Sequence, residues 1–207
     1  MRHSRALLTA LFSLSLASPA LAERYEIDPN HSDVSFKVRH MVVSKVQGRF
    51  DKFTGAFEYD EKTPEKWSAE ARIDAASVNT ANADRDNHLR QADFLDTANH
   101  PAMEFKSAGV TDVTGGGAKL QGNLSIRGVE RPVALDLVFG GTVTDPRGDK
   151  RAGFEAATTI NRQDFGVSFN KLLEAGGLVV GNDVEITIHV EGVARKEPKE
   201  QPAKKKK

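Results

Sequence analysis

The chain has 207 residues, with 29 basic and 29 acidic side chains and no cysteine. This length fits one globular domain with a core of its own. The lack of cysteine excludes disulfides, thiol nucleophiles and cysteine-ligated metal centres. With 39% hydrophobic and 28% charged residues, the composition is that of a globular protein.

The first 22 residues are predicted to be a signal peptide. Two arginines precede an apolar run, Ala6–Ala17, that is too short to span a bilayer as a helix. The tripeptide ending at Ala22 fits the small-x-small cleavage rule, so we expect the mature chain to begin at Glu23. We therefore expect export to the periplasm. A buried N-terminal helix is the alternative.

Strict alternation of apolar and polar residues dominates the body of the chain. This period of two is typical of strands that bury one face. In chain order the expected apolar faces are Val34, Phe36 and Val38; Trp67, Ala69, Ala71 and Ile73; Met103 and Phe105; Leu120, Gly122, Leu124 and Ile126; Val133, Leu135, Leu137 and Phe139; Phe154, Ala156, Thr158 and Ile160; and Val184, Ile186, Ile188 and Val190.

The segment Val46–Tyr59 changes phase in its middle. Up to Phe50 its apolar residues have even numbers, and from Phe53 they have odd numbers. A one-residue slip near Asp51–Lys52 keeps both halves facing one core. A β-bulge produces such a slip, and bulges allow a long strand to curl around a barrel.

One segment, Ala83–Leu95, has helical character. Asn82 can cap it, and acidic residues in its first turn suit the helix dipole. Asp86 and Arg90 are four residues apart, the spacing of an ion pair along a helix.

About eight strands and one short helix predict an all-β fold, an antiparallel barrel of about eight strands. A β-sandwich also satisfies one-sided burial, but the long bulged strand favours the barrel. Glycine-rich turns at Gly115–Gly117 and Asp145–Gly148 are typical of hairpins. Small residues on the inward faces are compatible with two kinds of barrel interior: a cavity, or a core in which larger neighbours fill the space.

No catalytic or metal-binding motif is evident in the sequence. We therefore expect no catalytic residue, no metal and no cofactor. His40 shares the inward parity of Val38, and His88 lies one helical turn from Asp84. The histidines of the body lack metal-binding spacings; they are His31, His40, His88, His100 and His189.

Charge is segregated along the chain. The body, Glu23–Ala194, holds 20 basic and 27 acidic residues, a net charge of −7, which makes it a poor partner for nucleic acid. The segment Arg195–Lys207 holds seven basic residues against two acidic ones, and we expect it to be disordered. Such a tail suits weak contact with an anionic membrane surface; a tail that only aids solubility is the alternative.

Six blocks of sequence are similar, in their residues, order and spacing, to those of one protein family. They are Ile27–Ser32 with Val34–His40, Val46–Phe50 with Phe53–Gly55, Arg85–Arg90 with Ala92–Phe94, Pro101–Ser107, Leu124–Val129 with Arg131–Val133, and Ile160–Gly166. Together they resemble the YceI-like family of exported polyisoprenoid-binding proteins, from about Tyr25 to Val193. Phe169 departs from the family pattern, which has tryptophan there, and the basic tail is an addition.

The resemblance implies a lipocalin-like barrel whose apolar tunnel holds a long-chain isoprenoid lipid, an isoprenoid quinone or a similar amphiphile, without catalysis. Together with the predicted leader and tail, this divides the chain into a signal peptide (1–22), a YceI-like lipid-binding barrel (23–194) and a disordered basic tail (195–207). The expected ligand-binding wall is Phe36, Val38, His40, Val46, Phe50, Trp67, Ala71, Ile73, Phe105, Leu124, Ile126, Leu135, Leu137, Ile186 and Ile188.

Some polar residues are expected at the tunnel mouth. The candidates for contact with a lipid headgroup are Arg39, His40, Arg127, Arg131 and Arg162. For any single arginine, we favour a surface ion pair. We expect Arg85, Asp86, Leu89 and Phe94 to lock the helix onto the barrel end.

Two other functions compete with lipid storage or transport. One is an enzyme acting on an isoprenoid lipid, with His40 or His88 and nearby acids at the mouth. The other is a stress-related interaction protein whose barrel is a filled scaffold. The sequence leaves open the identity of the lipid, any delivery partner and the oligomeric state.

Overall fold

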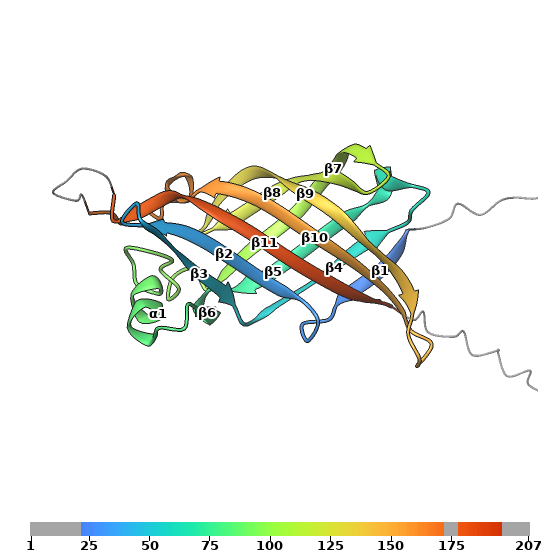
Figure 1. Cartoon of the computed structure of the whole chain (residues 1–207), viewed down its shortest axis with the longest axis horizontal. Helices are drawn as coiled ribbons and strands as arrows, with labels where there is room; N and C mark the ends of the chain where they lie inside the picture. Colours follow the sequence, from blue (N-terminus) through green and yellow to red (C-terminus); the bar gives the residue numbers. More distant parts are fainter. Residues whose placement is uncertain (1–21, 172–177, 196–207) are drawn as a thin grey trace, which may run out of the picture.

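The computed structural model describes residues 22–171 and 178–195, so the predicted signal peptide and most of the basic tail lie outside the described residues. Eight antiparallel strands close into a barrel, as expected (Figure 1). Closure comes from β1, which pairs with β4 on one side and with β11 on the other. The barrel strands are β1 (Glu23–Ile27), β4 (Phe53–Tyr59), β5 (Ser68–Asp74), β7 (Ala102–Thr114), β8 (Gly117–Ile126), β9 (Val129–Thr144), β10 (Lys150–Asn161) and β11 (Val180–Ala194).

Three further strands lengthen the barrel at one end. They are β2 (Asp33–His40), β3 (Ser44–Phe50) and β6 (Val78–Asn79). β2 pairs with the first part of β11, whereas β1 pairs with its last residues. Likewise β3 pairs with β2 and β6, while β4 pairs with β1 and β5. The pairs β1 and β2, β3 and β4, and β5 and β6 therefore act as three long strands, each interrupted once.

The predicted phase change at Asp51–Lys52 is confirmed, but it takes the form of a break and not a bulge within one strand. The backbone N–H of Asp51 donates to the Ser77 carbonyl (3.1 Å), and the N–H of Lys52 donates to the Ser77 hydroxyl (3.1 Å). A short 3₁₀ turn, Ala75–Ser77, thus satisfies these groups in place of a neighbouring strand. Both halves still face the same interior.

The helix α1 spans Ala83–Leu89 and is the one α-helix among the described residues. The Asn82 side chain caps it by accepting from the N–H of Arg85 (2.9 Å), as expected. The prediction that it reaches Leu95 is wrong. The N–H of Leu95 donates to the Leu89 carbonyl (3.0 Å), which turns the chain inward so that Phe94 is buried.

The contacts of Asp86 and Arg90 also differ from the expected ion pair along the helix. Asp86 is buried, and its carboxylate accepts from the backbone N–H (2.9 Å) and the hydroxyl (2.5 Å) of Thr80. Arg90 instead donates to the carbonyls of Ala76 (2.7 Å) and Val78 (3.0 Å). These bonds, with the packing of Leu89 and Phe94 in the core, lock the helix onto the barrel end as expected.

Three strands differ from the expected elements. β1 and β6 were not expected, and β7 continues to Thr114, well past the short row at Met103 and Phe105. A register shift between Ser107 and Gly109 breaks the alternation of β7, which hid its length. No described helix is long and apolar enough to cross a membrane.

Candidate functional site

An apolar cavity of about 560 Å³ lies inside the barrel. This volume is within the range of pockets that hold small-molecule ligands. The alternative of a filled barrel is therefore wrong for the described interior. Every residue expected in the tunnel wall does line the cavity: Phe36, Val38, His40, Val46, Phe50, Trp67, Ala71, Ile73, Phe105, Leu124, Ile126, Leu135, Leu137, Ile186 and Ile188. Their contact with a ligand stays a prediction.

The end of the cavity beside β1 is packed with aromatic rings. Tyr25 stacks on Phe57 with ring centroids 5.1 Å apart, and Phe57 meets the edge of Phe154 at 5.3 Å. Tyr59 packs against Trp67 at 4.9 Å in the same cluster. Burial raises the pKa of Tyr59 to about 12, so its phenol is neutral near pH 7. This cluster fills that end of the barrel with uncharged aromatic side chains.

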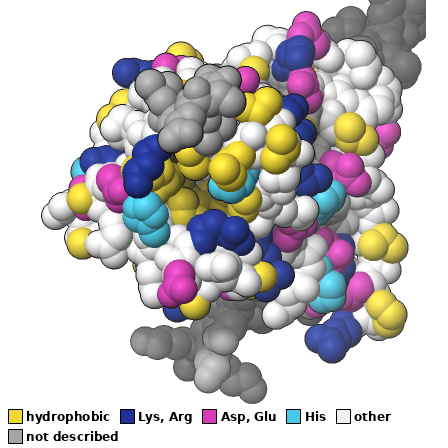
Figure 2. Space-filling model, turned by 60° about the vertical axis from the view of Figure 1, so that its left-hand side comes forward, with side chains coloured by type: hydrophobic (Ala, Val, Ile, Leu, Met, Phe, Trp, Pro, Cys, Tyr) yellow, Lys and Arg dark blue, Asp and Glu magenta, His cyan; other side chains and the backbone are white. Residues whose placement is uncertain are grey.

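The opposite end, beside α1, is hollowed. Figure 2 looks at this end and shows hydrophobic side chains in a hollow, with basic and histidine side chains around it. Phe94 and Phe169 pack there with ring centroids 4.6 Å apart, and His88 meets both rings edge-on. Phe169, where the resemblance predicts tryptophan, thus places an aromatic ring at the cavity wall.

The arginines expected near the mouth separate into two groups. Arg39 and Arg162, with His40, line the cavity, whereas Arg127 and Arg131 lie outside its wall. The hydrogen bonds of these arginines go to backbone carbonyls or to an amide, and not to carboxylates. Arg39 donates to the carbonyl of Val42, Arg127 to that of Phe94 and Arg131 to that of Glu130. Arg162 donates to the carbonyls of Val167, Val180 and Gly181 and to the side chain of Asn182. Among the described residues none of these arginines forms an ion pair with a carboxylate, although the charge of Arg39 helps to lower the pKa of Glu185, so the structure does not support the favoured interpretation as surface ion pairs.

Arg162 is the buried member of this group, with 5% of the residue exposed. Burial lowers its pKa from the ordinary arginine value, although a guanidinium stays protonated at neutral pH. Backbone carbonyls satisfy most of its donors, so a positive charge stands in the cavity wall with partial dipoles as its partners.

One histidine–aspartate pair lies at the cavity. His88 Nε2 is 2.8 Å from Asp93 Oδ2, and His88 lines the wall. The partner is Asp93 and not Asp84, because the turn after α1 brings residue 93 back beside the helix. Both side chains are nearly half exposed, at 48% and 43%. The similar pair of His189 with Asp33 (2.7 Å) joins neighbouring strands on the exposed outer face.

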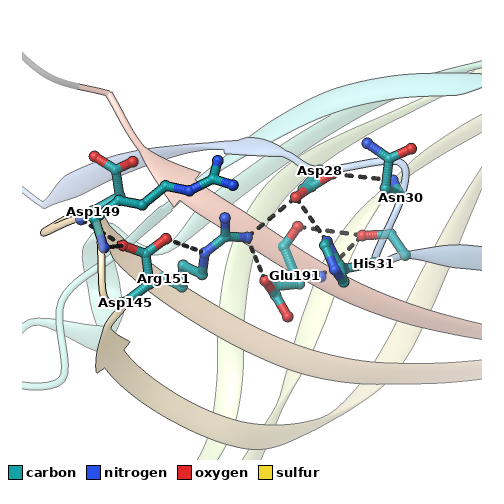
Figure 3. Close-up of polar contacts among 9 residues, drawn as sticks. Asp28, Asn30, His31, Asp145, Asp149, Arg151 and Glu191 are labelled. Carbon is teal, nitrogen blue, oxygen red and sulfur yellow. Dashed lines mark hydrogen bonds and ion pairs between the residues drawn. The ribbon is translucent and has the colours of Figure 1, made fainter.

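A second polar cluster lies outside the cavity wall, where β1, β10 and β11 meet (Figure 3). Asp28, His31 and Glu191 bring potential metal ligands within 4.8 Å of one another. Arg151 already supplies a positive charge there: its Nη1 donates to Asp28 (3.1 Å) and to Glu191 (2.5 Å). Its Nε donates to Asp145 (3.0 Å) in the turn between β9 and β10. We therefore interpret this cluster as a clasp between strands and assign no metal to it.

Part of the cavity wall comes from irregular segments that the sequence pattern does not predict. Leu95, Val167 and Val179 line the cavity but lie in turns or loops. Alternation of apolar residues, the signal that located the strands, does not exist in such segments. Their apolar character next to predicted elements was the available clue.

Comparison with known proteins gives the chain its relatives. A family model described as a YceI-like domain matches residues 25–192. A UPF0312 protein of Pectobacterium atrosepticum is 39% identical over 191 residues, which cover 91% of this chain and 96% of that protein.

Two solved structures have the same fold. The crystal structure of Burkholderia cenocepacia BcnA matches with a TM-score of 0.71 and 22% identity, over 80% of this chain and 98% of that one. A polyisoprenoid binding domain from Saccharophagus degradans, implicated in plant cell wall breakdown, matches with a TM-score of 0.62 and 19% identity, over 85% of this chain and all of that one. At these identities the likeness concerns the fold alone.

Proposed function

The chain belongs to the YceI-like family, and from this premise we propose that it is an exported, non-catalytic protein that stores or transports a long-chain polyisoprenoid, an isoprenoid quinone or a similar amphiphile in the periplasm. The observation that carries the proposal is the apolar cavity of about 560 Å³ inside the barrel. The polyisoprenoid binding domain that shares the fold supports the class of guest.

The energetics of an apolar cavity favour a long guest. Burying one CH₂-sized group gives roughly 0.8 kcal/mol, so one five-carbon isoprene unit gives on the order of 3–4 kcal/mol before costs. Association and ordering cost about 4–15 kcal/mol. One or two units barely offset that cost, whereas several units exceed it. A wall with few polar groups therefore selects its guest by length and apolarity.

Mass spectrometry of an organic extract tests this proposal. The exported chain is purified without detergent and extracted, and the extract is compared with that of an unrelated exported protein purified in the same way. We expect a long-chain isoprenoid lipid in substantial occupancy in the first extract alone. Equal lipid in both extracts, or none in either, would contradict the proposal.

The enzyme alternative has one observation in its favour, the pair of His88 and Asp93 at the cavity. A carboxylate at this distance can orient an imidazole for proton transfer. Incubating the protein with its extracted lipid, beside a His88→Gln variant, separates the two functions. We expect the lipid to be recovered unchanged from both proteins. Conversion by the unaltered protein and not by the variant would establish the enzyme.

The export and tail proposals come from sequence features outside the described residues. Cell fractionation followed by N-terminal sequencing should find a periplasmic protein that begins at Glu23.

The last described residue, Arg195, donates its N–H to the carbonyl of Arg24 (2.9 Å), so the tail begins beside β1. That is the aromatic end of the barrel, opposite α1 (Figure 1).

A further inference from the structure

The hairpin between β2 and β3 carries three consecutive exposed hydrophobic residues. Met41, Val42 and Val43 are 44%, 52% and 87% exposed. This tip, Met41–Val43, projects from the end of the barrel where α1 lies (Figure 1). Single exposed hydrophobic residues are common on proteins, but a consecutive run on a projecting turn indicates a surface that meets an apolar environment.

The backbone of the tip is unfavourable for these residue types. Met41 and Val42 have φ angles of 50° and 65°, and two successive residues at positive φ define the type I′ turn that Asn-Gly usually occupies. A β-branched valine at positive φ is an outlier. The turn is held by the N–H of Val43 on the His40 carbonyl (3.2 Å) and by Arg39 Nη1 on the Val42 carbonyl (2.9 Å). The backbone geometry of the turn favours other residue types, so it does not account for apolar side chains at these positions.

The tip is continuous with the mouth of the cavity. The N–H of Met41 donates to the carbonyl of Val179 (2.9 Å), and Val179 lines the cavity. On the strand that leads to the tip, Val38, Arg39 and His40 also line it. A surface that receives the tip therefore also faces the opening through which an apolar guest passes.

The charges around the mouth suit an anionic surface. Two exposed cations, Arg39 and Lys171, line the cavity at this end. Arg85 also lines it but donates to Thr80, and the buried Arg162 is bonded to backbone carbonyls. The two carboxylates of the wall belong to β4 and β5, and one of them, Glu70, bonds Arg24 of β1 (2.8 Å). Beside the tip, Lys45 pairs with Glu185 on the outer face. The acids near α1, including Asp84, lie outside the wall.

We propose that the tip Met41–Val43 inserts into the surface of a bilayer that contains anionic lipids and thereby seats the cavity mouth against that bilayer. Apolar side chains enter the boundary between headgroups and acyl chains, while the exposed Arg39 and Lys171 meet lipid phosphates. This proposal rests on the proposed function and specifies where a guest would pass between the membrane and the cavity. Partition onto vesicles measures it independently of the lipid extracted from the cavity.

Co-sedimentation with vesicles tests the proposal. The purified exported chain is mixed with vesicles of equal parts phosphatidylethanolamine and phosphatidylglycerol, and separately with phosphatidylcholine alone. We expect binding to the anionic vesicles, and weaker binding to the neutral ones. The double variant Met41→Asn, Val42→Gly gives the turn its preferred residues, so its thermal stability should be equal or higher. Its partition should fall about tenfold, since two apolar side chains are removed.

A matched pair of single variants controls for general loss of surface hydrophobicity. Val43→Asn at the tip (87% exposed) should weaken binding severalfold, whereas Val143→Asn, at another exposed valine on β9 (61%), should leave it unchanged. No binding by the unaltered chain, equal binding by the tip variants, or loss of binding only on deleting Lys204–Lys207 would each overturn the proposal. None of these outcomes changes the lipid content measured after extraction, so the two proposals can fail separately.

Discussion

Small residues on the inward faces have two different roles. A Cβ added at Gly48 would lie 2.4 Å from Phe36 Cζ, and one added at Gly122 would lie 2.5 Å from Phe105 Cζ. These glycines therefore make room for aromatic rings of the wall. Ala71 instead lines the cavity, between Gly55 and Phe105 on the neighbouring strands. The two interpretations left open for small inward residues are thus correct at different positions.

Replacing Ala71 with tryptophan should reduce lipid binding without unfolding the barrel. The indole would occupy cavity volume and would displace a guest and not a packed neighbour. Lipid content after extraction should fall sharply, and the melting temperature of the delipidated protein should change little. Stability is compared without lipid because a bound ligand itself stabilises the folded state.

The matched control is Ala75→Trp. Ala75 is 1% exposed in the packed core and does not line the cavity. The same increase in volume overpacks that site and should cost about 1–3 kcal/mol or more of unfolding free energy. Similar destabilisation by both variants, or full lipid occupancy in Ala71→Trp, would mean that Ala71 does not face the guest.

The carboxylate of Asp28 makes the clasp sensitive to acid. A hydrogen bond with His31, followed by the backbone N–H of Asn30, lowers the Asp28 pKa from 3.8 to about 2, and Arg151 adds to the effect. Because the folded pKa is depressed, the stabilisation is complete above about pH 4 and is lost as the pH falls toward 2. Unfolding measured across this window should show a smaller loss of stability in Asp28→Asn. An identical pH dependence would contradict the assigned contacts.

Among the elements, the stability of α1 should depend more on the buried carboxylate of Asp86 than on the exposed carboxylate of Asp84. Asp86→Ala removes the acceptor of the Thr80 N–H and hydroxyl, which are themselves buried. Leaving buried donors without partners should cost about 1–3 kcal/mol. The control Asp84→Ala removes an exposed acid of the same first turn and should cost less than about 1 kcal/mol. Urea unfolding measures both, and equal costs would reject the distinction.

For the molecule as a whole, we expect the aromatic end to limit how far the cavity extends. Phe154 lines the cavity and contacts Phe57, Tyr59, Trp67 and Phe139. Phe154→Ala should lengthen the cavity and shift the extracted lipids toward longer chains, at a cost on the order of 3 kcal/mol of stability. Phe154→Leu keeps most of the volume and should leave the chain lengths unchanged. Mass spectrometry of both extracts decides; an unchanged distribution in Phe154→Ala would place the limit on length elsewhere.

The sequence by itself determined the all-β class, the inward faces of the long strands and the start of the helix. The row from Val184 to Val190 and the cap at Asn82 are local, since each depends on residues a few positions apart. The phase change at Asp51–Lys52 was equally legible because it needs only the parity of its neighbours. The fifteen residues of the expected wall came from the same parity.

Only the tertiary structure decided that this wall encloses empty space, because alternation gives the direction of a side chain and not what stands opposite it. The end of α1 depends on the burial of Phe94, and the clasp at Arg151 joins residues from Asp28 to Glu191. The tip Met41–Val43 meets the mouth through Val179, more than a hundred residues away in the chain. Such contacts follow from closure of the barrel, which brings distant strands together and leaves no mark in local periodicity.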